Sequence, residues 1–287
     1  MPTFVNNWIG NLFRDRLAIF LGAGASIGAK NTEGRDLPTA YELRNELWLT
    51  LKHDKTKPFN PAHLKLMTLE HAAGIIETQT YRLPISEFLV KRFKCEKPLW
   101  QHVALPYLNP RSLFTTNYDE LIELGYKHYV KQLDIIRNDR TPMPDRTVLY
   151  KPHGSISHAN QKVGQGGLVI TQLDYLEMIA DYRDMLGKAM TGFGQSCVLT
   201  IGYSFGDMDI GAELFTIRKQ RADIPWYAVF PRNDPQVRAM YSKRWQIEQI
   251  NATFEEFWEE LDNEIDFLPN NLKHSKKNAL TTAGTIQ

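Results

Sequence analysis

Short, unbroken apolar runs alternate along the chain with longer stretches whose apolar residues recur at helical spacing. The apolar runs predict strands at 17–21, 111–116, 133–136, 147–151, 196–201, 226–230 and 247–250. Runs that are unbroken are typical of parallel strands covered by helices on both faces. Because helices separate the strands, we expect an α/β fold, a Rossmann-like parallel sheet flanked by helices.

The stretch between the first two predicted strands departs from this alternation. Residues 38–108 read as helical, with a helix starting at Leu37-Pro38-Thr39 and others over 62–78, 85–93 and 98–108. This is too long for one crossover, so we expect a helical insertion or cap after the first strand. Later helices are predicted over 121–130, 172–191, 209–221, 237–245 and 254–265, and the apolar face of the second of these holds Leu176, Ile179, Leu186 and Met190.

The expected organisation is one domain, residues 1–267, with the 38–108 insertion inside it and a polar tail over 268–287. A hydrophobic content of 43% is ample for a core, and a net charge of +1 gives no sign of direct nucleic-acid binding. Cys95 and Cys197 are too few and too far apart for a zinc ribbon or a disulfide framework. The sequence shows neither a signal peptide nor an apolar run of the ~18–20 residues that a membrane span needs, so we expect a soluble cytoplasmic protein without a membrane partner.

Unusual residues follow four of the predicted strands, namely Gly22-Ala23-Gly24-Ala25-Ser26, Thr116-Asn117-Tyr118-Asp119, Pro152-His153-Gly154-Ser155 and Gly202-Tyr203-Ser204. In open α/β sheets, ligands bind at the carboxyl ends of the strands. Glycines without a Cβ allow a sharp turn in which N–H groups approach a pyrophosphate. Taken alone, Asp119 could cap a helix and His153 could be an ordinary loop histidine. The four segments together favour a binding site.

These four segments, in this order, resemble the motifs of the sirtuin superfamily over about residues 16–233. The resemblance implies that NAD is bound, with Asn117 and Asp119 at the nicotinamide ribose and His153 as the catalytic histidine. It further implies an NAD-binding set made up of Gly22, Ala23, Gly24, Ser26, Thr116, Gly202, Ser204 and Asn233.

The chain also departs from the pattern of deacetylating sirtuins. Asp36-Leu37-Pro38-Thr39-Ala40 lacks the Phe-Arg of their first loop, two cysteines cannot build their four-cysteine zinc module, and no Phe-Gly-Glu segment follows His153. The profile looks like the sirtuin-like NADases of bacterial anti-phage defence, which cleave NAD to nicotinamide and ADP-ribose. The alternatives are an NAD-dependent protein deacylase or ADP-ribosyltransferase, and a non-catalytic module that senses NAD or ADP-ribose.

The chemistry of the three predicted catalytic residues fits that reaction. Asn117 can orient the ribose or a water, and His153 can take a proton near neutral pH. Asp119 can bond the carboxamide of nicotinamide or stabilise the cationic ribose. We expect NAD as substrate, no zinc, and control through homo-oligomerisation or a partner subunit, for which the resemblance favours a HerA-like ATPase.

Overall fold

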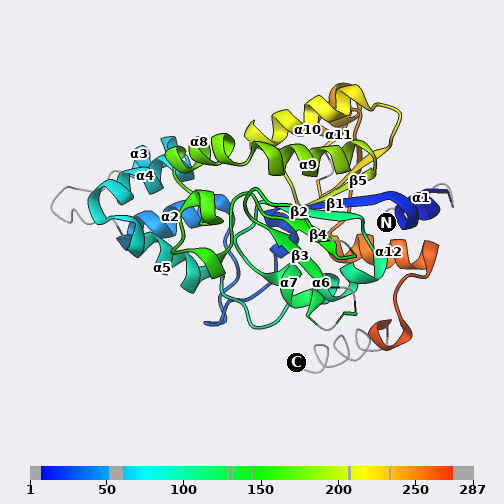
Figure 1. Cartoon of the computed structure of the whole chain (residues 1–287), viewed down its shortest axis with the longest axis horizontal. Helices are drawn as coiled ribbons and strands as arrows, with labels where there is room; N and C mark the ends of the chain where they lie inside the picture. Colours follow the sequence, from blue (N-terminus) through cyan, green and yellow to red (C-terminus); the bar gives the residue numbers. More distant parts are fainter. Residues whose placement is uncertain are drawn as a thin grey trace.

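The structure is a computed structural model, and it describes residues 8–51, 61–127, 129–130, 132–143, 145–205, 208–232 and 234–273. These residues form one parallel sheet in the order β3-β4-β2-β1-β5-β6-β7 (Figure 1). The strands are β1 (Leu17–Leu21), β2 (Ser112–Thr115), β3 (Leu133–Ile136), β4 (Thr147–Tyr150), β5 (Cys197–Ile201), β6 (Trp226–Val229) and β7 (Glu248–Ile250). All the predicted strands are present, and the Rossmann-like fold class is confirmed.

Alternate residues of β1 enter two different hydrophobic cores. Leu17, Ile19 and Leu21 face one core and Ala18 and Phe20 the other, and all five are almost fully buried. The first core is covered by α1 (Trp8–Arg16), α6 (Trp100–Ala104), α7 (Leu121–Tyr126) and α12 (Phe254–Ile265), the second by α9 (Arg183–Gly194) and α10 (Met208–Gln220). Figure 1 shows these two groups on opposite sides of the sheet. Burial on both faces explains the unbroken apolar runs.

A third core lies within the stretch between β1 and β2. It is built by three helices that we call the cap helices, α2 (Ala40–Leu51), α4 (Leu69–Thr80) and α5 (Arg82–Phe93), next to the short α3 (Pro61–Leu66). Their apolar residues pack on Tyr118 after β2 and on Ile156, Leu168 and Ile170 after β4. The cap helices therefore cover the carboxyl end of the sheet, beside α8 (Gln172–Asp181) in Figure 1.

Two predicted helices are each divided into two. The helix expected over 62–78 is interrupted at Thr68, whose Oγ accepts a hydrogen bond from the His71 amide (3.3 Å) and starts α4. The helix expected over 172–191 is broken at Tyr182, where the backbone leaves the helical region (φ −110°, ψ 22°). The predicted apolar face is consequently wrong in its first half, because Leu176 is 66% and Ile179 40% exposed.

Both ends of the described chain differ from the expectation in detail. Helix α1, which the pattern did not predict, packs on α12 through Ile9 and Phe13 of the first core. At the other end, Leu268 is buried and its amide donates to Asp262 Oδ1 (2.7 Å). The start of the predicted tail thus lies against α12, and its residues 274–287 lie outside the described part.

The remaining helix, α11 (Pro235–Met240), continues into one π-helical turn (Tyr241–Trp245). Within the described ranges, the helices are too short or too polar to cross a membrane.

Candidate active site

The predicted site segments meet where the strand order reverses. Strand β1 pairs with β2 on one side and with β5 on the other. In open α/β sheets, the crevice at such a reversal is where ligands bind. The loops after β1 and β5 are in direct contact there, since the Gly22 amide donates to Ile201 O (2.9 Å) and the Gly24 amide to Gly202 O (2.9 Å).

Three glycines make this contact possible. A Cβ on Gly24 would lie 2.6 Å from the Cα of Gly202, and one on Gly22 would lie 2.6 Å from the Gly202 carbonyl oxygen. Gly202 itself has φ +62°, and a Cβ there would lie 2.3 Å from the Ala25 nitrogen. The glycines are therefore required for packing one loop on the other, and the Gly22 and Gly24 amides are already engaged in that packing.

Ser26 joins the first turn to the loop after β2. Its hydroxyl donates to Asp119 Oδ2 (2.8 Å) and accepts from Asn117 Nδ2 (3.1 Å), which also donates to Gly22 O (3.0 Å). These contacts fix the orientation of the Asn117 amide. The hydrogen bonds recorded among the described residues use its NH₂ group, so its Oδ1 oxygen is the acceptor that remains for a ligand.

Asp119 is held at both carboxylate oxygens. Besides the Ser26 contact, Oδ1 accepts from the Leu121 amide (3.1 Å) at the start of α7, and the residue is only 4% exposed. A carboxylate in this position orients Ser26 and, through Ser26, the side chain of Asn117.

A buried lysine connects the loops after β2 and β4. Lys151 is 1% exposed, and its Nζ donates to the Asp119 carbonyl (2.6 Å) and to Glu123 Oε1 (2.9 Å). Nearby, burial raises the pKa of Glu120, but hydrogen bonds from Ser157 and Ser155 and the Lys151 charge together lower it below the ordinary value. Because Lys151 precedes His153 by two residues, this charged cluster ties the His153 segment to the Asn117 segment.

His153 is 3% exposed, and its ring meets Tyr175 of α8 edge to face, with centroids 5.0 Å apart and planes at 78°. Its carbonyl accepts from the Val169 amide (3.1 Å), at the far end of the loop that joins β4 to α8. The position of His153 therefore depends on this loop, which we call the β4 loop (residues 151–171), and on α8.

Most of the predicted site residues line one cavity of about 180 Å³, which we call the inner cavity. They are Ala23, Ser26, Thr116, Asn117, Asp119, His153, Gly202 and Ser204. The cap helices and the residues just before them supply another wall, which includes Leu37, Pro38, Leu43, Glu70 and Phe93. The structure thus brings the loops after β1, β2 and β5 together with the His153 segment after β4.

A larger cavity of about 490 Å³, the outer cavity, lies on the other side of Gly202, Tyr203 and Ser204, which line both cavities. Gly24 lines it, together with aromatic residues and one residue of each charge: Phe230, Tyr241, Phe254, Arg232 and Glu255. Gly22 is not among the described lining residues of either cavity and acts through its backbone. The predicted Asn233 lies outside the described residues.

Several lining residues were not predicted. Tyr203 stands inside the Gly-Tyr-Ser segment, so the motif itself could have indicated it. Tyr175, Glu70 and Phe93 belong to helices and carry no local motif; only the packing of α8 and the cap helices brings them to the site. Among the described residues, no group of three or more His, Cys, Asp or Glu side chains is arranged to hold a metal ion.

A parallel sheet with a cavity at its reversal point defines a Rossmann-like α/β protein. A family model described as a SIR2-like domain matches residues 111–252, and this match confirms the resemblance to the sirtuin superfamily. Two solved structures show the same fold. One, from a study of the mechanism and regulation of Sir2 enzymes, gives a TM-score of 0.53 at 13% identity over 91% of this chain and 97% of that one. The other, a Sir2 homolog–NAD complex, gives 0.51 at 14% identity over 92% and 95%.

Relatives with curated names are similar in sequence. An NAD(+) hydrolase ThsA of Cytobacillus dafuensis is 28% identical over 75% of this chain and 40% of its own length. A second ThsA, of Bacillus cereus (strain MSX-D12), is 25% identical over 75% and 42%, and defense-associated sirtuin 2 of Bacillus subtilis is 29% identical over 50% and 14%. The chain therefore spans less than half the length of these relatives.

Proposed function

We propose that this protein is an NAD glycohydrolase that cleaves NAD to nicotinamide and ADP-ribose. The observation that carries the proposal is that Asn117 and His153, from loops after different strands, line one cavity together with Ser26 and Asp119. The relatives named NAD(+) hydrolase support the same activity.

We assign the nicotinamide riboside end of NAD to the inner cavity and the adenosine end to the outer cavity. The inner cavity, at about 180 Å³, is too small for a whole dinucleotide, since drug-sized ligands occupy roughly 300–1,000 Å³. The outer cavity is lined by the aromatic residues Phe230 and Tyr241, which we assign to the adenine ring, and by Arg232, which we assign to a phosphate. The pyrophosphate then passes Gly202–Ser204, the wall that the cavities share.

In the proposed reaction, the bond between ribose C1′ and the nicotinamide nitrogen breaks, and its electron pair leaves with neutral nicotinamide. The ribose becomes cationic, water adds to C1′, and the proton of that water passes to His153. The Oδ1 oxygen of Asn117 accepts a hydrogen bond from a ribose hydroxyl or from the water. Asp119 holds Ser26 and Asn117 in place, so its role is to orient the site.

We further propose an anti-phage defence role in the cytoplasm, in which the active protein depletes NAD. The name defense-associated sirtuin 2 of one relative supports this role. An NAD-depleting enzyme has to be restrained, so the proposal includes a homo-oligomer and a regulatory partner subunit, for which a HerA-like ATPase is the favoured candidate.

The test is to incubate the purified protein with NAD, alone and with a HerA-like ATPase, and to quantify nicotinamide and ADP-ribose by chromatography. Asn117→Ala and His153→Ala are expected to abolish product formation. Arg221→Gln, at the residue that follows α10 and is not among the described residues lining either cavity, is expected to leave it unchanged. Turnover that requires an acylated peptide would identify a deacylase instead. NAD binding without turnover, alone or with the ATPase, would identify a sensor.

A further inference from the structure

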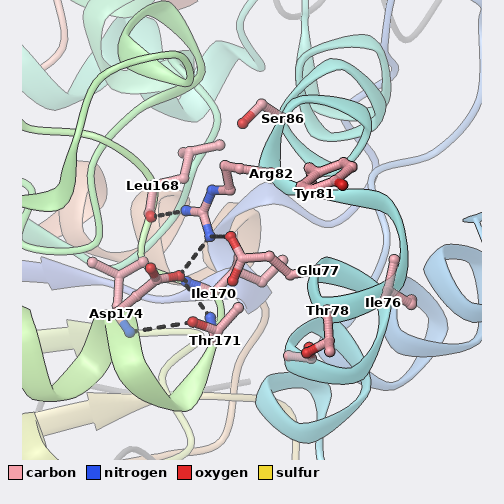
Figure 2. A network of polar contacts seen from close by, with 12 residues as sticks. Ile76, Glu77, Thr78, Tyr81, Arg82, Ser86, Leu168, Ile170, Thr171 and Asp174 are labelled. Atoms are coloured by element: carbon pink, nitrogen blue, oxygen red, sulfur yellow. Dashed lines mark hydrogen bonds and ion pairs between the residues drawn. The ribbon is translucent and has the colours of Figure 1, made fainter.

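An arginine at the junction of two cap helices reaches across to the start of α8. Arg82 is the first residue of α5 and follows Tyr81, whose φ of +67° turns the chain sharply between α4 and α5. Arg82 Nη1 donates to Asp174 Oδ2 (2.8 Å), and Nη2 donates to the Leu168 carbonyl. Glu77 Oε1 lies 3.4 Å from Nη1 (Figure 2).

Asp174 collects several donors on one oxygen. Its Oδ2 accepts from the Ile170 amide (2.9 Å) and the Thr171 amide (2.8 Å) as well as from Arg82, and its own amide donates to Thr171 Oγ1 (3.2 Å). The bond from the Thr171 amide to Asp174 Oδ2 and the bond from the Asp174 amide to Thr171 Oγ1 form the capping box that starts α8. Arg82 is thus bonded to the end of the β4 loop and to the first turn of α8 at the same time.

The burial of this group separates it from an ordinary surface ion pair. The Asp174 side chain is 12% exposed and that of Arg82 30%. Burial lowers the pKa of the Arg82 guanidinium, but the charge of Asp174 and the bond to it outweigh that effect and raise the pKa above its usual value. Loss of Arg82 would leave a mostly buried carboxylate and a carbonyl each short of a donor, which is far more costly than loss of an exposed pair.

The segment that Arg82 holds is the one that supports His153. The Val169 amide donates to the His153 carbonyl (3.1 Å), the Val169 carbonyl accepts from Tyr118 Oη (2.6 Å), and Tyr175, one residue after Asp174, packs its ring on the His153 imidazole. Arg82 itself is not among the described residues that line either cavity. Its bonds to Leu168 and Asp174 connect it to the site through the neighbouring residues Val169 and Tyr175.

We propose that Arg82 is a positioning residue: its contacts with Asp174 and Leu168 fix residues 168–175 so that the His153 imidazole keeps its place in the inner cavity. The cap helices thereby set the geometry of the active site without touching the substrate. The kinetic part of this inference rests on the proposed NAD cleavage, whereas the placement of His153 does not.

The matched control is Ser86 on the same helix. Its buried hydroxyl donates to the Ala159 carbonyl (2.9 Å), so it too bonds α5 to the β4 loop, but at a point away from residues 168–175. If α5 only stabilised the fold, Arg82→Gln and Ser86→Ala would act alike. The proposal requires them to differ.

The experiment compares Arg82→Gln, Arg82→Lys and Ser86→Ala with the wild type in two measurements. The first is kcat and KM for NAD. Arg82→Gln is expected to lower kcat ~10- to 100-fold with KM changed less than about twofold, because a shift of about 1 Å in a catalytic group has an effect of that size. Arg82→Lys should recover part of kcat, since an ammonium can bond Asp174 but cannot reach Asp174 and Leu168 together. Ser86→Ala should leave kcat within about twofold.

The second measurement is the NMR signal of the His153 ring, assigned by its loss in a His153→Gln variant. It is expected to shift in Arg82→Gln and to stay in place in Ser86→Ala. An unchanged His153 signal together with an unchanged kcat in folded Arg82→Gln would overturn the inference, as would equal effects of Arg82→Gln and Ser86→Ala. A wild type that binds NAD without cleaving it would overturn the proposed function alone, because the NMR comparison still decides where His153 lies.

Discussion

The hydroxyl of Ser26 donates to the carboxylate of Asp119 at 2.8 Å, although 93 residues separate the two along the chain. This bond joins the turn after β1 to the loop after β2 and supplies the partner that the Asn117 amide also uses. The two motifs are therefore one hydrogen-bonded unit, and a change in either is expected to disturb the other.

Ser26→Ala tests this unit. The substitution leaves Asp119 Oδ2 buried without its donor, which should lower the free energy of unfolding by about 1–3 kcal/mol. It should also lower NAD turnover, since the Asn117 amide loses one of its two acceptors. Urea denaturation gives the first quantity. Thr191→Ala removes an exposed helical hydroxyl (2.8 Å from Gly187 O) and should stay within ~0.5 kcal/mol of the wild type.

Gly202→Ala should be far more destabilising than Gly28→Ala. Both glycines have positive φ, +62° and +87°, so an alanine is strained at either position. Only at Gly202 does the new Cβ also meet backbone, 2.3 Å from the Ala25 nitrogen, whereas nothing lies within 4 Å at Gly28. The free energy of unfolding of the two variants, measured by denaturation, separates the cost of backbone strain from the cost of the steric clash. Equal losses would mean that contact between the loops after β1 and β5 contributes nothing.

Lys151→Met should lower the free energy of unfolding by about 3–5 kcal/mol, because it removes one partner of a buried ion pair and leaves Glu123 charged and mostly enclosed. The matched variant is Lys30→Met. Lys30 and Asp36 lie 2.8 Å apart, against 2.9 Å for Lys151 and Glu123, but their side chains are 59% and 69% exposed. The expected loss is under about 1 kcal/mol. A similar loss in both variants would show that burial does not govern the Lys151 pair.

Stability should fall as the pH drops from about 6.5 to about 4, in part because of His102 on α6. Burial lowers the pKa of this imidazole from 6.5 to about 4. Between pH 6.5 and pH 4, His102 is therefore protonated in the unfolded chain and neutral in the folded chain. The contribution is complete above pH 6.5 and is lost progressively below it, on the order of 3 kcal/mol in total.

The measurement is the free energy of unfolding at several pH values for the wild type and His102→Gln. Between pH 6.5 and pH 4, the free energy of unfolding of the variant is expected to fall less steeply than that of the wild type, whatever its absolute stability. His71→Gln, which changes an exposed histidine of α4, should keep the wild-type slope. A wild-type slope in His102→Gln would show that His102 does not take part.

Strand positions could be predicted from local pattern because a strand buried on both faces must be apolar throughout. The predictions that failed depend on contacts between distant segments. Leu176 and Ile179 have helical spacing, but α8 ends at Asp181, before the helix that carries Leu186 and Met190 begins, and both of these α8 side chains are exposed. Helix α1 is recognisable only through the core that it shares with α12.

The sequence by itself determined that glycine, asparagine, aspartate and histidine follow four of the strands. It also determined that they meet, because the carboxyl ends of parallel strands lie at one edge of the sheet. Only the tertiary structure decided how those residues are used: the glycines pack loop on loop, Asp119 orients Ser26, and Lys151 joins two loops. It also placed the Tyr175 ring against His153, and Arg82 in contact with Asp174 and Leu168. The physical reason is that these contacts join residues far apart in the chain, and no local spacing encodes such distances.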